Sequence, residues 1–261
     1  MPTLTTQTVA LADISTNGYQ RDRKDSHVDS IVNGFDITQW NLPKVVASRK
    51  GGYRVVLGQH RVEAARVLAS TPAKWPFPTP VGEIECSVVH GLKTEEEEAR
   101  LFLADDRNTK RLSPYDRHHA GLVAKEPRAL DVQGAVDTVG IPIVHKQRHQ
   151  NGKSLSAIGA LNNVWGMGGR ALLDETMAVV ASWPDSDHKR TEGYLIGGLA
   201  TVIAEGQTAG TWDRKKAIRR LTRAHNLPVN IYGEAMKIAA GTGLAFNSYH
   251  PYAAVLRKQI G

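Results

Sequence analysis

The sequence predicts an α+β protein in which a small mixed sheet comes first and an all-helical region follows. Short runs rich in β-branched residues alternate with glycine and proline turns through the first 90 residues, as in a compact sheet. From about residue 128 onward, apolar residues recur mainly at helical spacing. We therefore expect an N-terminal domain over residues 1–124 and a mostly helical domain over residues 125–261.

The first elements of the N-terminal domain follow from its turn residues. Strands are expected over residues 8–14, 43–48, 53–57 and 82–89. A helix is expected over residues 25–34, closed by Gly34, and a second from the Gly58 turn to about Ser70. The proline-rich segment 71–80 is expected to be a loop.

Two helix starts are predicted after these strands. Thr94 with Glu97 three residues later forms a capping box for a helix that runs to about residue 106. The acidic run of this first turn is expected to stabilise the helix rather than to bind a metal. Ser113 and Pro114 suit the N-cap and the first position of the next helix.

The second domain is expected to consist of helices with one small hairpin. The hairpin is expected over residues 141–155, turned at Asn151-Gly152, after a helix that ends near Val139. The later helices are expected over residues 156–165, 169–183, 191–205, 212–226, 229–241 and 250–259.

The most informative segment is Val55–Arg66, where a β-branched run ends at Gly58 and an alanine-rich helix begins. Glycine lets a ligand approach the backbone closely, and the free N–H groups of a helix's first turn attract anions. Arg61 adds a guanidinium that can bind phosphate through two hydrogen bonds. This pattern favours a phosphate site at Gly58–Arg61; the alternative is a tight turn whose arginine only meets solvent.

Composition limits the class of protein. The hydrophobic share of 41% and the charged share of 23% are ordinary for a globular protein. No apolar run reaches the roughly 18 residues of a membrane helix, and no secretory signal pattern is visible. Cys86 is the single cysteine, so an internal disulfide and a cysteine-based metal site are excluded, and no residue of the chain is assigned as a metal ligand. We expect a cytoplasmic protein (host cytoplasm if phage-encoded) with no membrane partner.

The net charge of +7 is concentrated in the second half of the chain. Residues 1–120 carry 16 Lys and Arg against 15 Asp and Glu, whereas residues 121–261 carry 17 against 11. The segment 212–226 predicts an amphipathic helix with a basic outer face, which suits DNA as a partner. The cations expected to contact DNA are Arg214, Lys215, Arg219, Arg220 and Arg223. A merely solvated basic face is the alternative.

Three blocks of the first domain resemble the ParB/sulfiredoxin superfamily. Tyr19-Gln20-Arg21, within the block Ile14–Arg23, resembles the first ParB box. Gly58-Gln59-His60-Arg61 resembles the GERR-x-x-A box of ParB and the GCHR box of sulfiredoxin. It is most similar to the DGQHR signature of DNA phosphorothioation regulators and many phage proteins, with Leu57 in place of the aspartate. The third block, Phe102–Pro114, resembles the ParB box that closes over the triphosphate.

The resemblance implies a nucleoside triphosphate, ATP or CTP with Mg²⁺, bound over the second block. The residues that it implies for this site are Gly58, Gln59, His60, Arg61, Asn108 and Arg111. His60 and Asp22 are the candidates for a catalytic role; a structural histidine and a solvated acidic surface are the alternatives. Gln59 stands where sulfiredoxin has its reactive cysteine, which excludes thiol reductase chemistry. ParB has a carboxylate at the position of Gln59. This chain therefore lacks a group that the resemblance associates with CTP hydrolysis.

Together these observations favour a ParB-like protein, of phage or actinobacterial type, that binds a nucleoside triphosphate and associates with DNA. One alternative is an ATP-dependent phosphotransferase that resembles the free-serine kinases of this fold or modifies DNA or nucleotides. Another is a non-catalytic interaction protein that retains the fold. Whether the chain is an enzyme stays open; the reaction expected of an enzyme is triphosphate hydrolysis or phosphoryl transfer. A homodimer is one oligomeric state that the resemblance allows.

Overall fold

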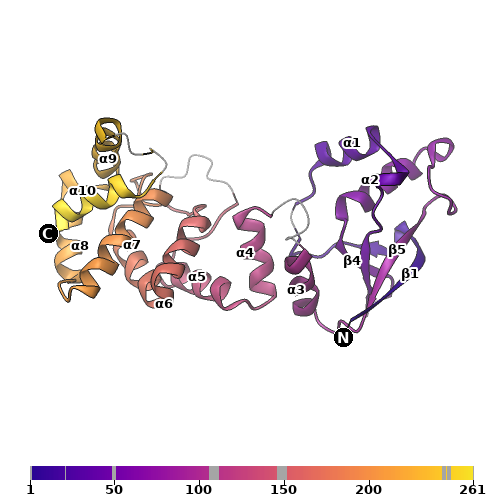
Figure 1. Cartoon of the computed structure of the whole chain (residues 1–261), viewed down its shortest axis with the longest axis horizontal. Helices are drawn as coiled ribbons and strands as arrows, with labels where there is room; N and C mark the ends of the chain where they lie inside the picture. The colour runs from indigo at the N-terminus through magenta and orange to yellow at the C-terminus, as the bar shows by residue number, and fades with distance from the viewer. Residues whose placement is uncertain are drawn as a thin grey trace. The chain divides into compact units, whose positions relative to one another are not determined.

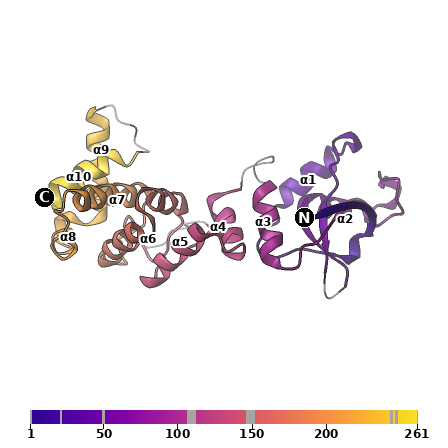
Figure 2. The same cartoon turned by 60° about the horizontal axis from the view of Figure 1, so that its bottom comes forward.

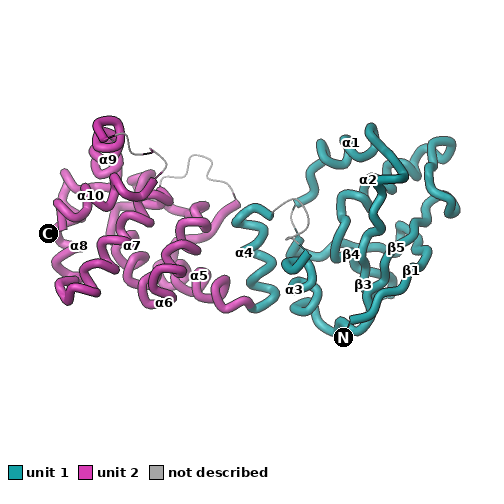
Figure 3. The backbone as a smooth tube through the Cα atoms, viewed as in Figure 1, with its two compact units in different colours: residues 1–125 teal, residues 126–261 magenta. Residues whose placement is uncertain are grey.

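A computed structural model describes residues 2–20, 22–48, 51–105, 112–145, 152–242, 245 and 248–260. The chain divides into two compact units, residues 1–125 and 126–261 (Figure 3). The first unit contains a five-stranded mixed sheet with its helices, and the described part of the second unit is helical apart from one isolated bridge (Figures 1 and 2). The expected α+β class, with a small mixed sheet followed by a helical region, is confirmed.

The sheet of the first unit has the strand order β1-β5-β3-β4-β2. Its strands are β1 (Thr3–Ala10), β2 (Ile14–Ser15), β3 (Lys44–Ala47), β4 (Tyr53–Leu57) and β5 (Glu83–His90). β5 lies antiparallel to β1 and parallel to β3; β4 lies antiparallel to β3 and parallel to β2.

The bounds expected for the first strand, residues 8–14, are wrong. Residues 11–13 form a 3₁₀ turn, and Ile14 belongs to β2, whereas β1 begins at Thr3. Residues 3–8 are all exposed, so they lack the alternation of buried and exposed side chains by which a half-buried strand is recognised.

The described part of the first unit contains four α-helices. They are α1 (Asp25–Asn33), α2 (Gln59–Ala69), α3 (Glu95–Asp105) and α4 (Pro114–Val123). The capping box is confirmed, because the Glu97 amide donates to Thr94 Oγ1 (3.2 Å) and the Thr94 amide donates to Glu97 Oε2 (3.2 Å). Ser113 caps α4 by accepting a hydrogen bond from the amide of Asp116 (3.1 Å), with Pro114 in the first position, as expected.

Both faces of the sheet are covered at β4, whose successive residues point to opposite sides. Val55 packs in one apolar cluster with α2, and its neighbour Val56 packs in another with α3 and α4. Cys86 of β5 is fully buried in the α2 cluster, and burial raises the pKa of its thiol to about 12. The Gly58 turn therefore follows a strand that is packed on both sides.

The second unit contains six described helices around one core. They are α5 (Pro127–Thr138), α6 (Ile158–Ser182), α7 (Gly193–Thr208), α8 (Arg214–Leu221), α9 (Pro228–Thr242) and α10 (His250–Ile260). The helix α7 packs against α6 and α10, and side chains such as Met177, Leu199 and Leu256 are fully buried between them. None of the described helices is long and apolar enough to cross a membrane.

Several details of this unit differ from the expectations. The helices expected over residues 156–165 and 169–183 form one element, α6, which is non-helical at Gly168 and Gly169. The helix expected over residues 212–226 ends at Leu221, because the side chains of Trp183 and Asn226 bind carbonyls of its last turn.

The hairpin expected over residues 141–155 is wrong. Ile143 and Leu155 form an isolated parallel bridge, whereas a hairpin requires antiparallel pairing. Asn151 of the expected turn lies outside the described residues.

Candidate functional site at the Gly58 turn

The turn between β4 and α2 is built around Gly58, whose backbone is left-handed (φ +91°, ψ +23°). A β-carbon at this position would lie 3.2 Å from Cα and 3.3 Å from Cβ of Pro43, so the conformation favours glycine and the space for a side chain is tight. The Gly58 carbonyl accepts hydrogen bonds from the amides of Arg61 (2.9 Å) and Val62 (3.1 Å). Glycine offers no side chain to the first amides, so the N-terminus of α2 has no side-chain cap.

Arg61 lies on the first turn of α2 with its side chain half buried. Its guanidinium donates no hydrogen bond to any residue that the structure describes. Burial lowers the pKa of Arg61, and the carboxylate of Asp105 at the end of α3 acts in the opposite direction. Asp105 is itself paired with Lys44, at 3.2 Å. Arg61 therefore remains a half-buried cation without a bonded anion, and an external anion would offset its desolvation.

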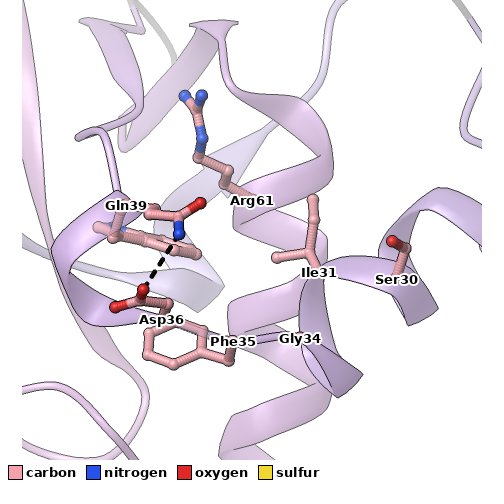
Figure 4. Close-up of a pocket in the computed structure, with 8 residues that line it drawn as sticks. Ser30, Ile31, Gly34, Phe35, Asp36, Gln39 and Arg61 are labelled. Atoms are coloured by element: carbon pink, nitrogen blue, oxygen red, sulfur yellow. Dashed lines mark hydrogen bonds between the residues drawn. The ribbon is translucent and has the colours of Figure 1, made fainter.

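Arg61 also lines a pocket of about 220 Å³. The other lining residues come from the end of α1 and the segment that follows it: Ser30, Ile31, Gly34, Phe35, Asp36, Gln39 and Trp40. Figure 4 shows Gln39 beside Arg61, with Asp36 and Phe35 farther along the pocket. The rings of Phe35 and Trp40 lie 5.6 Å apart and make part of the wall aromatic. Sequence reasoning missed this pocket, because its residues carry no recognisable spacing.

The first sequence block lies against the turn. The side-chain amide of Gln20 donates to the carbonyls of Val55 (2.6 Å) and Val56 (2.9 Å) near the end of β4. The amide of Lys24 donates to Nε2 of His60 on α2, at 3.2 Å. These bonds hold Gln20 against the end of β4 and Lys24 against the first turn of α2. Arg21 lies outside the described residues.

The third block begins beside the same turn. Lys44, which pairs with Asp105, lies opposite Leu57 in the register of β3 and β4. The end of α3 is thereby held next to the Gly58 turn. Asn108 and Arg111, the two residues expected to close the site, lie outside the described residues. One or more described residues of each block therefore lie at the Gly58 turn: Gln20 of the first, Gly58–Arg61 of the second and Asp105 of the third.

His60 and Asp22 occupy contrasting positions. His60 is 6% exposed, lies against the ring of His27 (4.8 Å between centroids), and accepts the Lys24 amide at Nε2. In this arrangement Nε2 is not available to a phosphate. Asp22 is exposed and hydrogen-bonds to no described residue, which fits a solvated carboxylate.

Two glutamines at the turn have buried side-chain oxygens without a hydrogen-bond partner. One is Oε1 of Gln59, the first residue of α2, and the other is Oε1 of Gln20. A buried polar atom without a partner is uncommon and calls for a ligand, water or ion that satisfies it. Among the described residues, no group of three or more His, Cys, Asp or Glu is placed to hold a metal ion.

The basic face expected in the second unit is smaller than the sequence pattern indicates. Arg214 is hydrogen-bonded to Glu175, with 2.9 Å between Nε and Oε1, and this bond raises the pKa of Arg214 and lowers that of Glu175. Arg220 donates to the carbonyl of Ile260 at the end of α10. The cations of this face that are exposed and bonded to no described residue are Lys215, Arg219 and Arg223.

These observations define a class: an α+β protein of two compact units, with a strand–glycine–helix turn suited to an anion. The family model described as "Family of unknown function (DUF6551)" matches residues 14–259, and the chain belongs to this family. No curated protein matches the chain. Among solved structures, it is similar to one titled "Structure of the C2221 form of Pnob8-like ParB-N domain". The identity is 11%, the TM-score is 0.43, and the match covers 100% of this chain and 99% of that chain.

Proposed function

We propose that this protein is ParB-like, binds a nucleoside triphosphate at the Gly58 turn, and associates with DNA through α8. The observation that carries the nucleotide proposal is Arg61, a half-buried guanidinium bonded to no described residue at the uncapped N-terminus of a helix. Backbone amides together with an arginine fork are the groups that bind polyphosphates in proteins. The phosphates would therefore lie over Gly58–Arg61.

The pocket beside Arg61 supports a ligand with more than a phosphate. Its volume of about 220 Å³ is below the roughly 300 Å³ of pockets that enclose a whole drug-sized molecule, so it suits one part of a ligand. Phe35 and Trp40 offer aromatic surface for a nucleobase, and Asp36 and Gln39 offer polar groups. A nucleoside in this pocket would place its phosphates toward Arg61.

The residues at the turn also fit the Mg²⁺ that accompanies a triphosphate. Mg²⁺ at phosphate sites is usually bound by one or two carboxylates together with the phosphates and waters, and carbonyl oxygens also suit it, so it needs no large cluster of carboxylates. The unpartnered Oε1 of Gln59 is an oxygen of the required kind at the required turn. A bound Mg²⁺ would neutralise phosphate charge there.

The described geometry supports binding more directly than phosphoryl transfer. Transfer or hydrolysis requires a base or carboxylate within hydrogen-bond reach of the reacting group. Nε2 of His60 is engaged by the Lys24 amide, and Asp22 is exposed without a described partner. We therefore propose nucleotide binding as the activity of the site.

The nucleotide proposal is tested by titration calorimetry of the full chain with ATP, CTP, GTP and UTP in Mg²⁺. We expect at least one of them to bind, and Arg61→Ala to weaken it by about tenfold or more, the loss of a charge-assisted hydrogen bond. Lys74→Ala, which removes an exposed cation of the same unit, is the matched control and should bind like wild type. Absence of binding to all four, or equal binding by Arg61→Ala, would contradict the site.

The DNA proposal rests on the three exposed cations of α8 and its end. Each phosphate that a protein neutralises contributes about 0.9 to the slope of log affinity against log salt, so three contacts give a slope near −3. Fluorescence anisotropy with a labelled duplex measures this slope. We expect Arg219→Ala to reduce the magnitude of this slope by about 1, from near −3 to near −2, whereas Arg214→Ala, at a cation already paired with Glu175, should change it less. A slope near zero in the wild type would remove DNA from the proposal.

A further inference from the structure

One edge of the sheet is formed by β1, the first strand in the order β1-β5-β3-β4-β2 (Figure 1). β1 pairs with β5 without a break, from Thr3 opposite His90 to Ala10 opposite Glu83. Among the described residues, no strand pairs with its other side. Alternate residues of such a strand direct their N–H and C=O groups outward, away from the sheet.

This edge has none of the features by which proteins usually prevent edge pairing. Such edges are commonly short, bulged, or interrupted by charged residues or proline. β1 is eight residues long, its register has no bulge, and its sequence TLTTQTVA contains neither a charged residue nor proline. The opposite edge, β2, has only two residues. Residues 3–8 are exposed, and Leu4 is 61% exposed.

We propose that β1 is a self-association edge: two copies of this chain pair β1 with β1, antiparallel and around a two-fold axis. The two five-stranded sheets would then continue into one another. The second copy is the occupant that the strand itself favours, because a neutral strand meets its own copy without like-charge repulsion. A two-fold axis places the same surface of both copies in the interface. Once two copies are paired, neither β1 strand has a free edge for a third copy, so association stops at the dimer.

The side chains of β1 fit this symmetric pairing. Four of the six exposed residues are threonine, whose β-branched side chain favours strands and pairs well with threonine across strands. Only every second residue of β1 directs its backbone N–H and C=O groups toward the partner. Even-numbered residues of one copy therefore lie opposite even-numbered residues of the other, and odd-numbered opposite odd-numbered. A threonine at an even position then meets an even-numbered residue of the other copy, and Leu4 stays on the face that it shares with Thr6 and Thr8.

Self-association at β1 leaves the Gly58 site of each copy unobstructed within the sheet. β4, which leads into Gly58, is three strands away from β1, about 14 Å at the usual strand spacing. The interface is a single pair of strands, so it belongs to the small and transient class rather than to permanent dimers. The proposal is therefore independent of nucleotide binding and predicts a concentration-dependent equilibrium.

Sedimentation velocity of the full chain, over roughly 1 μM to 1 mM, tests the proposal. We expect a reversible monomer–dimer equilibrium that Thr6→Lys weakens about tenfold or more, because it brings like charges together across the axis. Thr71→Lys, the same substitution in an exposed loop of the same unit, is the matched control and should associate like wild type. A wild-type monomer at all concentrations, or an equal equilibrium in Thr6→Lys, would overturn the proposal.

Hydrogen exchange of the wild type provides a readout that needs no variant. The outward amides of β1 should exchange more slowly at high than at low protein concentration, because pairing protects them, while amides of β2 should not change. Protection confined to segments other than residues 3–10 would show a dimer formed elsewhere and would overturn the assignment.

Discussion

Substitution of Gly58 by alanine tests the geometry of the strand-to-helix turn. A residue other than glycine costs about 1–2 kcal/mol in the left-handed conformation, and Gly58 has φ +91°. The added β-carbon, 3.2 Å from Cα of Pro43, adds overpacking of about 1 kcal/mol or more. We therefore expect the free energy of unfolding of the first unit to fall by about 2–3 kcal/mol. At roughly 4 °C per kcal/mol for a unit of this size, Tm should fall by about 8–12 °C.

The matched control is Gly82→Ala in the same unit. Gly82 has nearly the same backbone angle, φ +89°, but a β-carbon there meets no atom within 4 Å. The free energy of unfolding of Gly82→Ala should therefore fall only by the cost of the left-handed conformation, about 1–2 kcal/mol. Scanning calorimetry of the three proteins gives the comparison. Equal losses in the two variants would refute the argument that Pro43 limits the space at the turn, and no loss in either would refute the conformational argument as well.

Three other residues give predictions that follow from burial and pairing. Glu98 is 1% exposed and forms an ion pair with Arg54, so Glu98→Ala should cost about 3 kcal/mol in urea unfolding, and a loss below about 1 kcal/mol would contradict a structural ion pair. Burial raises the pKa of Cys86 to about 12, so its thiol should resist a thiol reagent at pH 8 in the native protein and react after denaturation; rapid native labelling would contradict its burial. A hydrogen bond from Arg214 holds the pKa of Glu175 in the folded protein below its ordinary value of 4.5. The ionised Glu175 therefore contributes its full stabilisation above pH 4.5, and this contribution is lost as the pH falls through the pKa of Glu175 in the folded protein. Acid unfolding of the second unit should therefore depend less on pH in Arg214→Ala, and an unchanged pH dependence would contradict this coupling.

Elements with local end signals were predictable from the sequence. α1 ends at Gly34, α3 begins with the Thr94 capping box, and α4 begins at Ser113 and Pro114, as expected. Each of these signals acts between residues a few positions apart, so a single sequence contains it. The bounds of the first strand could not be predicted in this way, because β1 is held by β5, more than 70 residues away, and not by its own pattern of apolar residues.

The candidate site was predictable only in part, for the same reason. Gly58 and Arg61 stand out in the sequence because a strand, a glycine and a helix follow one another directly. The pocket with Phe35 and Trp40 did not stand out, because folding alone places the segment after α1 beside Arg61. Similarly, the basic pattern of α8 does not show that Glu175 pairs with one of its arginines.

The sequence by itself determined the α+β class, the helix caps and the Gly58–Arg61 turn, because these depend on local conformation and short spacings. The tertiary structure decided which charges remain unbonded within the described residues, which side chains line the pocket, and which strand forms the free edge of the sheet. Those properties depend on contacts between distant segments. Arg61 shows both contributions, since its place in the turn is set locally, whereas its pocket is completed by the end of α1 and the segment after it, which only folding brings beside it.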